Sequence, residues 1–130
     1  MSNDALRHAF DPASIAIIGA SDDPNKIGGR PIHYMKRHGY RVIPVNPRET
    51  EVLGEKSYPS LLDVHEPVDI VDVFRAPSAL PGIAKEAVEI GAKALWCQFG
   101  VINEEGARIA AEGGLDVVMD RCIKVEHARY

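Results

Sequence analysis

The sequence predicts an α/β fold in which helices cover both faces of one five-stranded parallel sheet. Short apolar runs alternate along the chain with segments whose apolar residues have helical spacing, which is the pattern of β–α–β units with right-handed crossovers. The first of these runs is apolar at almost every position, as strands buried on both faces of a parallel sheet are. We therefore expect a single doubly wound domain with the strand order 3-2-1-4-5.

The composition fits one globular domain and excludes several function classes. The chain has 130 residues, which is enough to bury about two thirds of its unfolded surface. Its formal net charge of −4 argues against binding to nucleic acid, which needs a basic face. No apolar run approaches the roughly 18 residues of a membrane span, and residues 1–10 lack the apolar core of a signal peptide. Cys97 and Cys122 have no metal-ligand spacing, so we expect a cytoplasmic protein with free thiols.

The first expected strand, 14–19, leads into a candidate anion site. It ends in a turn of three small residues, Gly19, Ala20 and Ser21. A polar loop follows, and then a helix begins. At such a junction the backbone N–H groups and the positive end of the helix dipole point at one place. Lys26 and Arg30 add positive charge beside it, so we expect a phosphate ligand here.

The elements expected between residues 28 and 64 have a less regular spacing of apolar residues. The first helix is expected at about 28–38, and the second strand at 40–46. Pro44 should lie near the end of that strand or at a bulge, because proline cannot donate to a ladder. In the segment that follows, 52–55 are expected to form a small extra strand or turn, and 60–64 a short helix.

The second half of the chain repeats the strand–helix alternation. The remaining strands are expected at 69–74, 94–99 and 116–119. Ser78 is a plausible N-cap for a helix that ends near residue 90. Asn103 is expected to cap the next helix, and 121–129 to form the last one.

Four loops of this arrangement converge at the carboxyl ends of the strands. They are 19–30, 46–48, 74–78 and 98–101. In doubly wound sheets, ligands bind at this edge, where the winding reverses beside the first strand. The convergence predicts a nucleotide-like ligand.

The residues after the second strand narrow the choice of nucleotide. Proteins that bind NAD carry Asp or Glu there for a ribose 2′-hydroxyl, together with a G-x-G-x-x-G turn, and this chain has neither. It has Asn46, Pro47 and Arg48, and a cation suits a ribose that carries its own phosphate. NADP and coenzyme A both carry one. The chain has no recognisable substrate domain for hydride transfer, which disfavours NADP, but an NADP-dependent or other nucleotide-using enzyme stays open as the alternative.

Several stretches resemble the stand-alone coenzyme-A-binding proteins, in matching order along nearly the whole chain. They are 14–22 with Lys26, 42–47, 72–77, 96–101 and 118–129. These small bacterial and archaeal Rossmann-like proteins are similar to the N-terminal domain of the succinyl-CoA synthetase alpha subunit. The resemblance implies that residues 1–130 form one Rossmann-like CoA-binding domain without the synthetase's phosphohistidine domain. It therefore implies a carrier, sensor or accessory module for CoA or an acyl-CoA, and a protein-interaction module without a ligand is a third hypothesis.

The resemblance also assigns a part of coenzyme A to each loop. The pyrophosphate would meet the backbone of Gly19, Ala20 and Ser21, with charge from Lys26 and Arg30. The adenosine and its 3′-phosphate would lie among Asn46, Pro47 and Arg48. The adenine or ribose would be flanked by the edge formed by Phe74, Arg75, Ala76 and Pro77. The pantetheine arm would approach Gln98 and Phe99.

The sequence gives no catalytic constellation and leaves one chemical question. Its histidines have no spacing that indicates a metal or a general base, and Trp96 and Phe99 are expected to be core residues. Cys122 follows Arg121 at the start of the last helix, where both the arginine and the helix N-terminus favour a thiolate. One hypothesis is that it forms a mixed disulfide with coenzyme A under oxidation. The alternative is an inert residue that packs the last helix.

Overall fold

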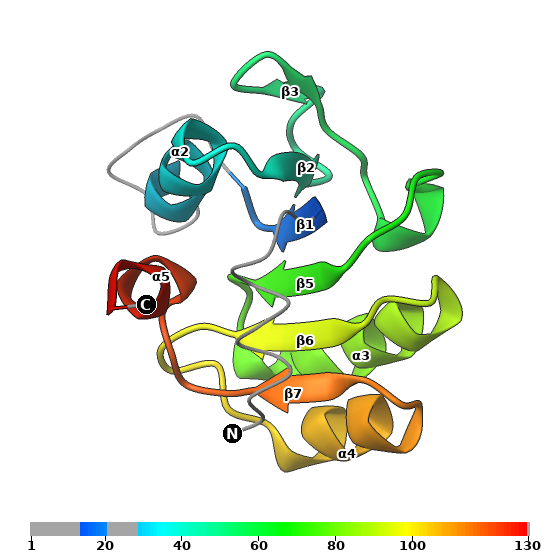
Figure 1. Cartoon of the computed structure of the whole chain (residues 1–130). Coiled ribbons are helices and arrows are strands. Elements are labelled where there is room, and N and C mark those ends of the chain that lie inside the picture. Colours follow the sequence, from blue (N-terminus) through cyan, green and yellow to red (C-terminus); the bar gives the residue numbers. More distant parts are fainter. Residues whose placement is uncertain (1–13, 21–28, 130) are drawn as a thin grey trace.

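The computed structural model in Figure 1 describes residues 14–20 and 29–129 of the chain. The strands of this region are β1 (Ser14–Ile18), β2 (Arg41–Val45), β3 (Glu51–Val52), β4 (Glu55–Lys56), β5 (Ile70–Val73), β6 (Ala94–Cys97) and β7 (Asp116–Val118). Its helices are α2 (Gly29–Arg37), α3 (Leu80–Glu89), α4 (Glu104–Glu112) and α5 (Ile123–Arg129), and its 3-10 turns are η1 (Leu61–Asp63) and η2 (Pro77–Ala79). Within this region, no helix is long and apolar enough to cross a membrane.

Helices cover both faces of a parallel sheet, as the sequence predicts. Five strands pair in parallel in the order β2-β1-β5-β6-β7 (Figure 1). On one face, Ile17 of β1 shares a core with Met35 of α2 and Ile123 of α5. On the other face, Val71 of β5 shares a second core with Ala84 of α3, and α4 packs along α3. The α/β class and the doubly wound layers are confirmed.

The predicted strand order is wrong. Counted in chain order, the five strands of the main sheet lie 2-1-3-4-5, not 3-2-1-4-5. The third of them, β5, pairs with β1 along its whole length, from Ile15 opposite Ile70 to Ile18 opposite Val73. The winding of the sheet therefore reverses between β1 and β5, and this is where the ligand crevice of such a sheet is expected.

Two sets of contacts explain this order. At the start of the strands, the Asp69 backbone donates to Ser14 Oγ at 3.0 Å, and the Ser14 backbone donates to Asp69 Oδ2 at 3.1 Å. At the free edge of β2, Tyr58 forms a parallel bridge with Val45, and its backbone donates to Pro44 O at 3.0 Å. The segment that follows β2 thus occupies the edge that the third strand would need.

Pro44 lies next to the last residue of β2, near the end of the strand as predicted. Its carbonyl accepts from Tyr58 on the outer side of the strand. Because the N and C=O of one strand residue point to the same side, the missing N–H of Pro44 also faces away from β1. The ladder with β1 therefore loses no hydrogen bond to the proline.

The segment between β2 and β5 forms the small elements that the sequence predicts. The strands β3 and β4 pair as an antiparallel hairpin that includes residues 52–55. Ser60 caps the turn η1, because its hydroxyl accepts from Leu62 N. This turn brings Ser60 beside α3, where it contributes to the site described below.

The caps of α3 and α4 differ from each other. Asn103 caps α4 as predicted, because its Oδ1 accepts from Gly106 N at 2.9 Å. Ser78 does not cap α3: it lies within η2, and the residue before α3 is Ala79, which makes no side-chain cap bond. The proline at residue 77 starts a 3-10 turn instead, which removes the extended residue that a capping serine needs.

The two aromatic residues near the end of β6 have opposite environments. Trp96 is fully buried and its Nε1 donates to Arg121 O at 2.7 Å, which confirms it as a core residue. Phe99 is 66% exposed, so its predicted core position is wrong. The strand ends at Cys97, and Phe99 lies in the turn beyond it, where the alternation of buried faces no longer applies.

Candidate functional site

The loop after β1 is fixed between its two neighbouring strands. Gly19 donates to Val45 O at 2.9 Å, and Phe74 donates to Ile18 O at 3.0 Å. Gly19 has a φ of 93°, and a Cβ at this residue would lie 2.9 Å from the carbonyl oxygen of Phe74. Only glycine combines this backbone conformation with such a close approach. The loop therefore leaves β1 directly over the point where the winding reverses.

Asn46 ties the β2 loop to the β1 loop. Its Nδ2 donates to Ala20 O at 2.9 Å, and its Oδ1 accepts from Arg48 N at 2.9 Å. The second bond is the local turn that asparagine commonly makes two residues ahead. The side chain of Asn46 thus shapes the edge of the site, whereas Pro47 and Arg48 are exposed beside it.

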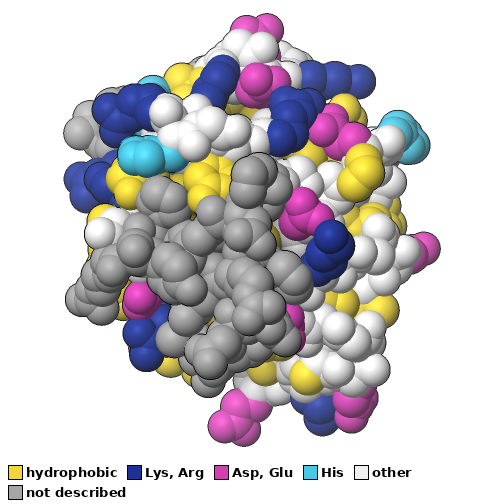
Figure 2. Space-filling model, viewed as in Figure 1, with side chains coloured by type: hydrophobic (Ala, Val, Ile, Leu, Met, Phe, Trp, Pro, Cys, Tyr) yellow, Lys and Arg dark blue, Asp and Glu magenta, His cyan; other side chains and the backbone are white. Residues whose placement is uncertain are grey.

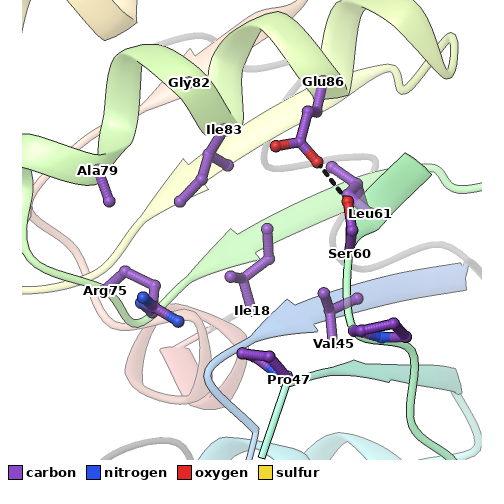
Figure 3. Close-up of a pocket in the computed structure, with 11 residues that line it drawn as sticks. Ile18, Val45, Pro47, Ser60, Leu61, Arg75, Ala79, Gly82, Ile83 and Glu86 are labelled. Atoms are coloured by element: carbon purple, nitrogen blue, oxygen red, sulfur yellow. Dashed lines mark hydrogen bonds between the residues drawn. The ribbon is translucent and has the colours of Figure 1, made fainter. Parts of the chain in front are cut away.

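The first pocket of this edge lies between β1, β2, β5 and α3; we call it the β1–β5 pocket (Figure 3). It has a volume of about 340 Å³. Its apolar walls include Ile18, Val45, Pro47, Leu61 and Ile83. Its polar side chains are Ser60, Arg75 and Glu86, of which Ser60 Oγ donates to Glu86 Oε1 at 2.9 Å. Apolar walls with a few polar groups are typical of small-molecule sites.

A second pocket, the β6 pocket, lies on the opposite face of the sheet, beside α2 and α5. Its volume is about 390 Å³. It is lined by Arg30, Pro31, Phe74, Gln98, Phe99, Cys122, Lys124 and Val125. It brings together the predicted residues Arg30 and Gln98 with the half-buried Cys122, whose disulfide with coenzyme A stays a prediction.

A third hollow lies beside both of these pockets. It measures about 310 Å³ and lies between the β5 and β6 loops. It shares Arg75 with the β1–β5 pocket, and Phe74, Gln98 and Phe99 with the β6 pocket. The three hollows therefore follow one another along the carboxyl edge of the sheet, and this edge offers an elongated path rather than a single round cavity.

Positive charge gathers at the β6 end of this path. Arg30 and Lys124 line both the β6 pocket and a neighbouring hollow of about 270 Å³, which His33 and Arg37 also line. Figure 2 shows Lys, Arg and His side chains gathered over the region of α2, although the whole chain is acidic. Such a local concentration of cations favours an anionic ligand.

The cations of the carboxyl edge also differ from those at the amino edge in their partners. At the amino edge, Lys93 pairs with Asp69 at 3.2 Å, and Arg41 pairs with Glu66 at 2.8 Å. Within residues 14–20 and 29–129, the side chains of Arg48 and Arg75 make no hydrogen bond or ion pair. Their charges are therefore available to a phosphate.

A buried carboxyl group lies behind the β6 pocket. Asp72 faces the side of the sheet that α2 and α5 cover, between Ile17 and Trp96, and it is fully buried. Its Oδ1 accepts from Gln98 Nε2, and its Oδ2 has no partner among the described residues. Burial raises the pKa of Asp72 to about 8, and this effect outweighs the opposite effect of the hydrogen bond from Gln98. Burial likewise raises the pKa of Cys97 to about 12, so that thiol is inert at neutral pH.

The structure thus brings together most of the predicted site residues and adds others. The carboxyl edge of the sheet contains most of the residues that the sequence predicts for the site: Gly19, Ala20, Arg30, Asn46, Pro47, Arg48, the edge from Phe74 to Pro77, and Gln98. Ser21 and Lys26 lie outside the described residues. Sequence reasoning missed Ser60, Asp72 and Glu86. Two of these residues had a signal in the sequence: Asp72 is an aspartate inside an apolar strand, and Glu86 lies about one helical turn after Ile83. No local pattern links residue 60 to residue 86.

The chain matches the family model described as "CoA binding domain" over residues 13–128. It is 45% identical to YneT of Bacillus subtilis over 88% of this chain and 84% of that protein, which is described as uncharacterized. It is 33% identical to the alpha subunit of ADP-forming acetate–CoA ligase II of Pyrococcus furiosus over 92% of this chain, but it spans only 29% of that subunit.

Solved structures share the fold of this chain along nearly its whole length. A hypothetical protein from Pyrococcus horikoshii OT3 superposes with a TM-score of 0.93 at 37% identity, over 99% of this chain and 92% of that one. A protein from Thermus thermophilus superposes with a TM-score of 0.91 at 42% identity, over 99% and 98% of the two chains. By its match to the family model over residues 13–128, the chain belongs to the CoA-binding domain family.

Proposed function

We propose that this protein binds coenzyme A or an acyl-CoA along the carboxyl edge of its sheet, as a carrier, sensor or accessory module. The observation that carries the proposal is the row of three hollows, in which the middle hollow shares Arg75 with one neighbour and Phe74, Gln98 and Phe99 with the other. Coenzyme A is an elongated ligand with a nucleotide at one end and an apolar arm at the other. A row of hollows of this kind suits it better than a single cavity does.

Each part of the ligand has a candidate position. The adenosine would occupy the β1–β5 pocket, and the pyrophosphate would lie at the Gly19–Ala20 turn where β1 ends. Arg48 would meet the 3′-phosphate, because its side chain has no partner within the described part of the fold. The pantetheine arm would then run over Phe74 toward the β6 pocket, in which Phe99 and Val125 offer apolar surface.

The relatives support the binding part of this proposal and not a reaction. The Pyrococcus furiosus relative is an ADP-forming acetate–CoA ligase subunit, and the match covers under a third of its length. Among the described residues there is no group of His, Cys, Asp or Glu that could hold a metal ion. The proposal therefore concerns ligand binding, and it assigns no reaction to this chain.

The ligand carried by gently purified protein tests the proposal. Native mass spectrometry of the protein, followed by analysis of the released small molecule, should give coenzyme A or an acyl-CoA. A released nicotinamide nucleotide would favour the NADP-dependent enzyme instead. Protein that carries nothing, and that also fails to take up added coenzyme A, would favour an interaction module without a ligand.

A further inference from the structure

The β1–β5 pocket carries opposite charges at its two ends. Arg75 follows β5 at the carboxyl edge, and Glu86 stands on α3 at the far side of the pocket, with Ile18 and Ile83 between them (Figure 3). A phosphate is attracted to Arg75 and repelled by Glu86. The pocket therefore favours one orientation of a nucleotide, with the phosphates at the arginine and the base toward the glutamate.

The Glu86 carboxylate is held in place and keeps one oxygen available. Ser60 Oγ donates to Oε1, and the same hydroxyl accepts from Leu62 N, so Ser60 is committed on both sides. Within the described part of the chain, the Glu86 side chain makes no other hydrogen bond or ion pair. Figure 3 shows the second carboxylate oxygen turned away from Ser60. This oxygen can accept hydrogen bonds from a ligand and can donate none.

The available oxygen of Glu86 distinguishes purine bases by the hydrogen-bond donors that they present. Adenine presents an exocyclic amine, which matches a single carboxylate oxygen. Guanine engages a carboxylate best with two parallel N–H donors, and here Ser60 already occupies one of the two oxygens. Hypoxanthine places a carbonyl oxygen where adenine has its amine, and this oxygen would face a negative charge.

We propose that Glu86, positioned by Ser60, is the residue that selects adenine in the β1–β5 pocket, by accepting a hydrogen bond from the exocyclic amine. The inference rests on the proposed binding of coenzyme A. It adds the orientation of the nucleotide and a residue that determines which base is bound. A hydrogen bond to a charged group is strong enough that its loss changes affinity about tenfold or more.

The test compares coenzyme A with its deaminated form, in which hypoxanthine replaces adenine, by calorimetric titration. Wild-type protein should bind coenzyme A about tenfold more tightly than the deaminated form. Glu86→Ala should lose this preference, because coenzyme A loses its hydrogen bond and the deaminated form no longer faces a negative charge. Ser60→Ala should reduce the preference without abolishing it. Glu89→Ala, an exposed change on the same helix, should leave it intact.

The outcomes separate this inference from the proposed function. If wild-type protein binds both ligands equally, or if Glu86→Ala weakens both by the same factor, Glu86 does not select the base, although coenzyme A binding stands. If wild-type protein binds neither ligand, the proposed function itself fails. Thermal unfolding of unliganded Glu86→Ala, compared with Glu89→Ala, shows whether the variant is folded, and Glu86→Gln repeats the comparison with a smaller change of shape.

Discussion

Single polar side chains at the carboxyl edge divide into those already used within the fold and those that remain available to a ligand. The amide of Asn46 links two loops, and the amide of Gln98 is committed to Asp72. Arg48 and Arg75 have no such partner within residues 14–20 and 29–129. The residue types at these positions could be predicted to gather at one edge. Their internal hydrogen bonds could not, because they depend on loops that meet only in the folded chain.

Arg48→Ala should reduce the preference for coenzyme A over dephospho-coenzyme A. Arg48 is the cation that follows β2, where a 3′-phosphate is expected, and a charge-assisted contact accounts for roughly a tenfold difference in affinity. The preference is measured by calorimetric titration of both ligands. Arg108→Ala, which removes an exposed arginine on α4, is the matched control. If Arg48→Ala discriminates between the two ligands as wild-type protein does, another cation holds the 3′-phosphate.

Asp72 should make stability fall as the pH rises. Burial raises its pKa from about 3.8 to about 8, so the folded protein holds this proton more tightly than the unfolded chain does. The stabilising contribution is therefore complete below about pH 4 and is lost as the pH rises through about 8. Between these limits the free energy of unfolding falls by up to about 1.4 kcal/mol per pH unit.

Asp72→Asn tests this dependence, because asparagine cannot ionise and its amide oxygen can still accept from Gln98. Urea unfolding at several pH values should give a flatter profile for the variant than for wild-type protein. Asp63→Asn, an exposed change in η1, should keep the wild-type profile. Parallel curves for Asp72→Asn and wild-type protein would mean that folding does not raise the pKa of Asp72.

At the scale of elements, the position of α4 depends on a close approach to α3. A Cβ on Gly106 would lie 2.7 Å from Leu80 Cγ, which is nearer than van der Waals contact allows. Apolar spacing predicts that both helices pack on the sheet, but it does not show that they touch at this residue. The same holds for the strands. Their apolar runs can be read from the sequence, but the position at which β6 ends, before Phe99, depends on the turn that follows it.

Gly106→Ala should lower the free energy of unfolding by about 1–3 kcal/mol, because Leu80 and the two helices must move apart to admit the methyl group. Gly82→Ala is the control on α3: its Cβ would meet no atom within 4 Å, and alanine favours a helix by up to about 1 kcal/mol. Urea unfolding of unliganded protein measures both. A Gly106→Ala variant as stable as wild-type protein would show that the helices are not in close contact there.

At the scale of the whole molecule, the order of the strands decides where the ligand crevice lies. The sequence predicts a parallel sheet from its alternating pattern, and this is confirmed. It does not show that Ser14 bonds to Asp69 or that Tyr58 covers the edge of β2, and these contacts place β5 beside β1. The winding therefore reverses between β1 and β5, and the β1–β5 pocket lies there with Arg75 at its mouth.

Calorimetric titration of the wild-type protein with coenzyme A, dephospho-coenzyme A and NADP tests the central claim most directly. Coenzyme A should bind with one site per chain and the highest affinity, and the dephosphorylated form should bind roughly tenfold more weakly. NADP should bind most weakly, because its phosphate is on the 2′ position and it has no pantetheine arm for the β6 pocket. Saturable binding of NADP that is tighter than that of coenzyme A, or no binding of coenzyme A at all, would contradict the account.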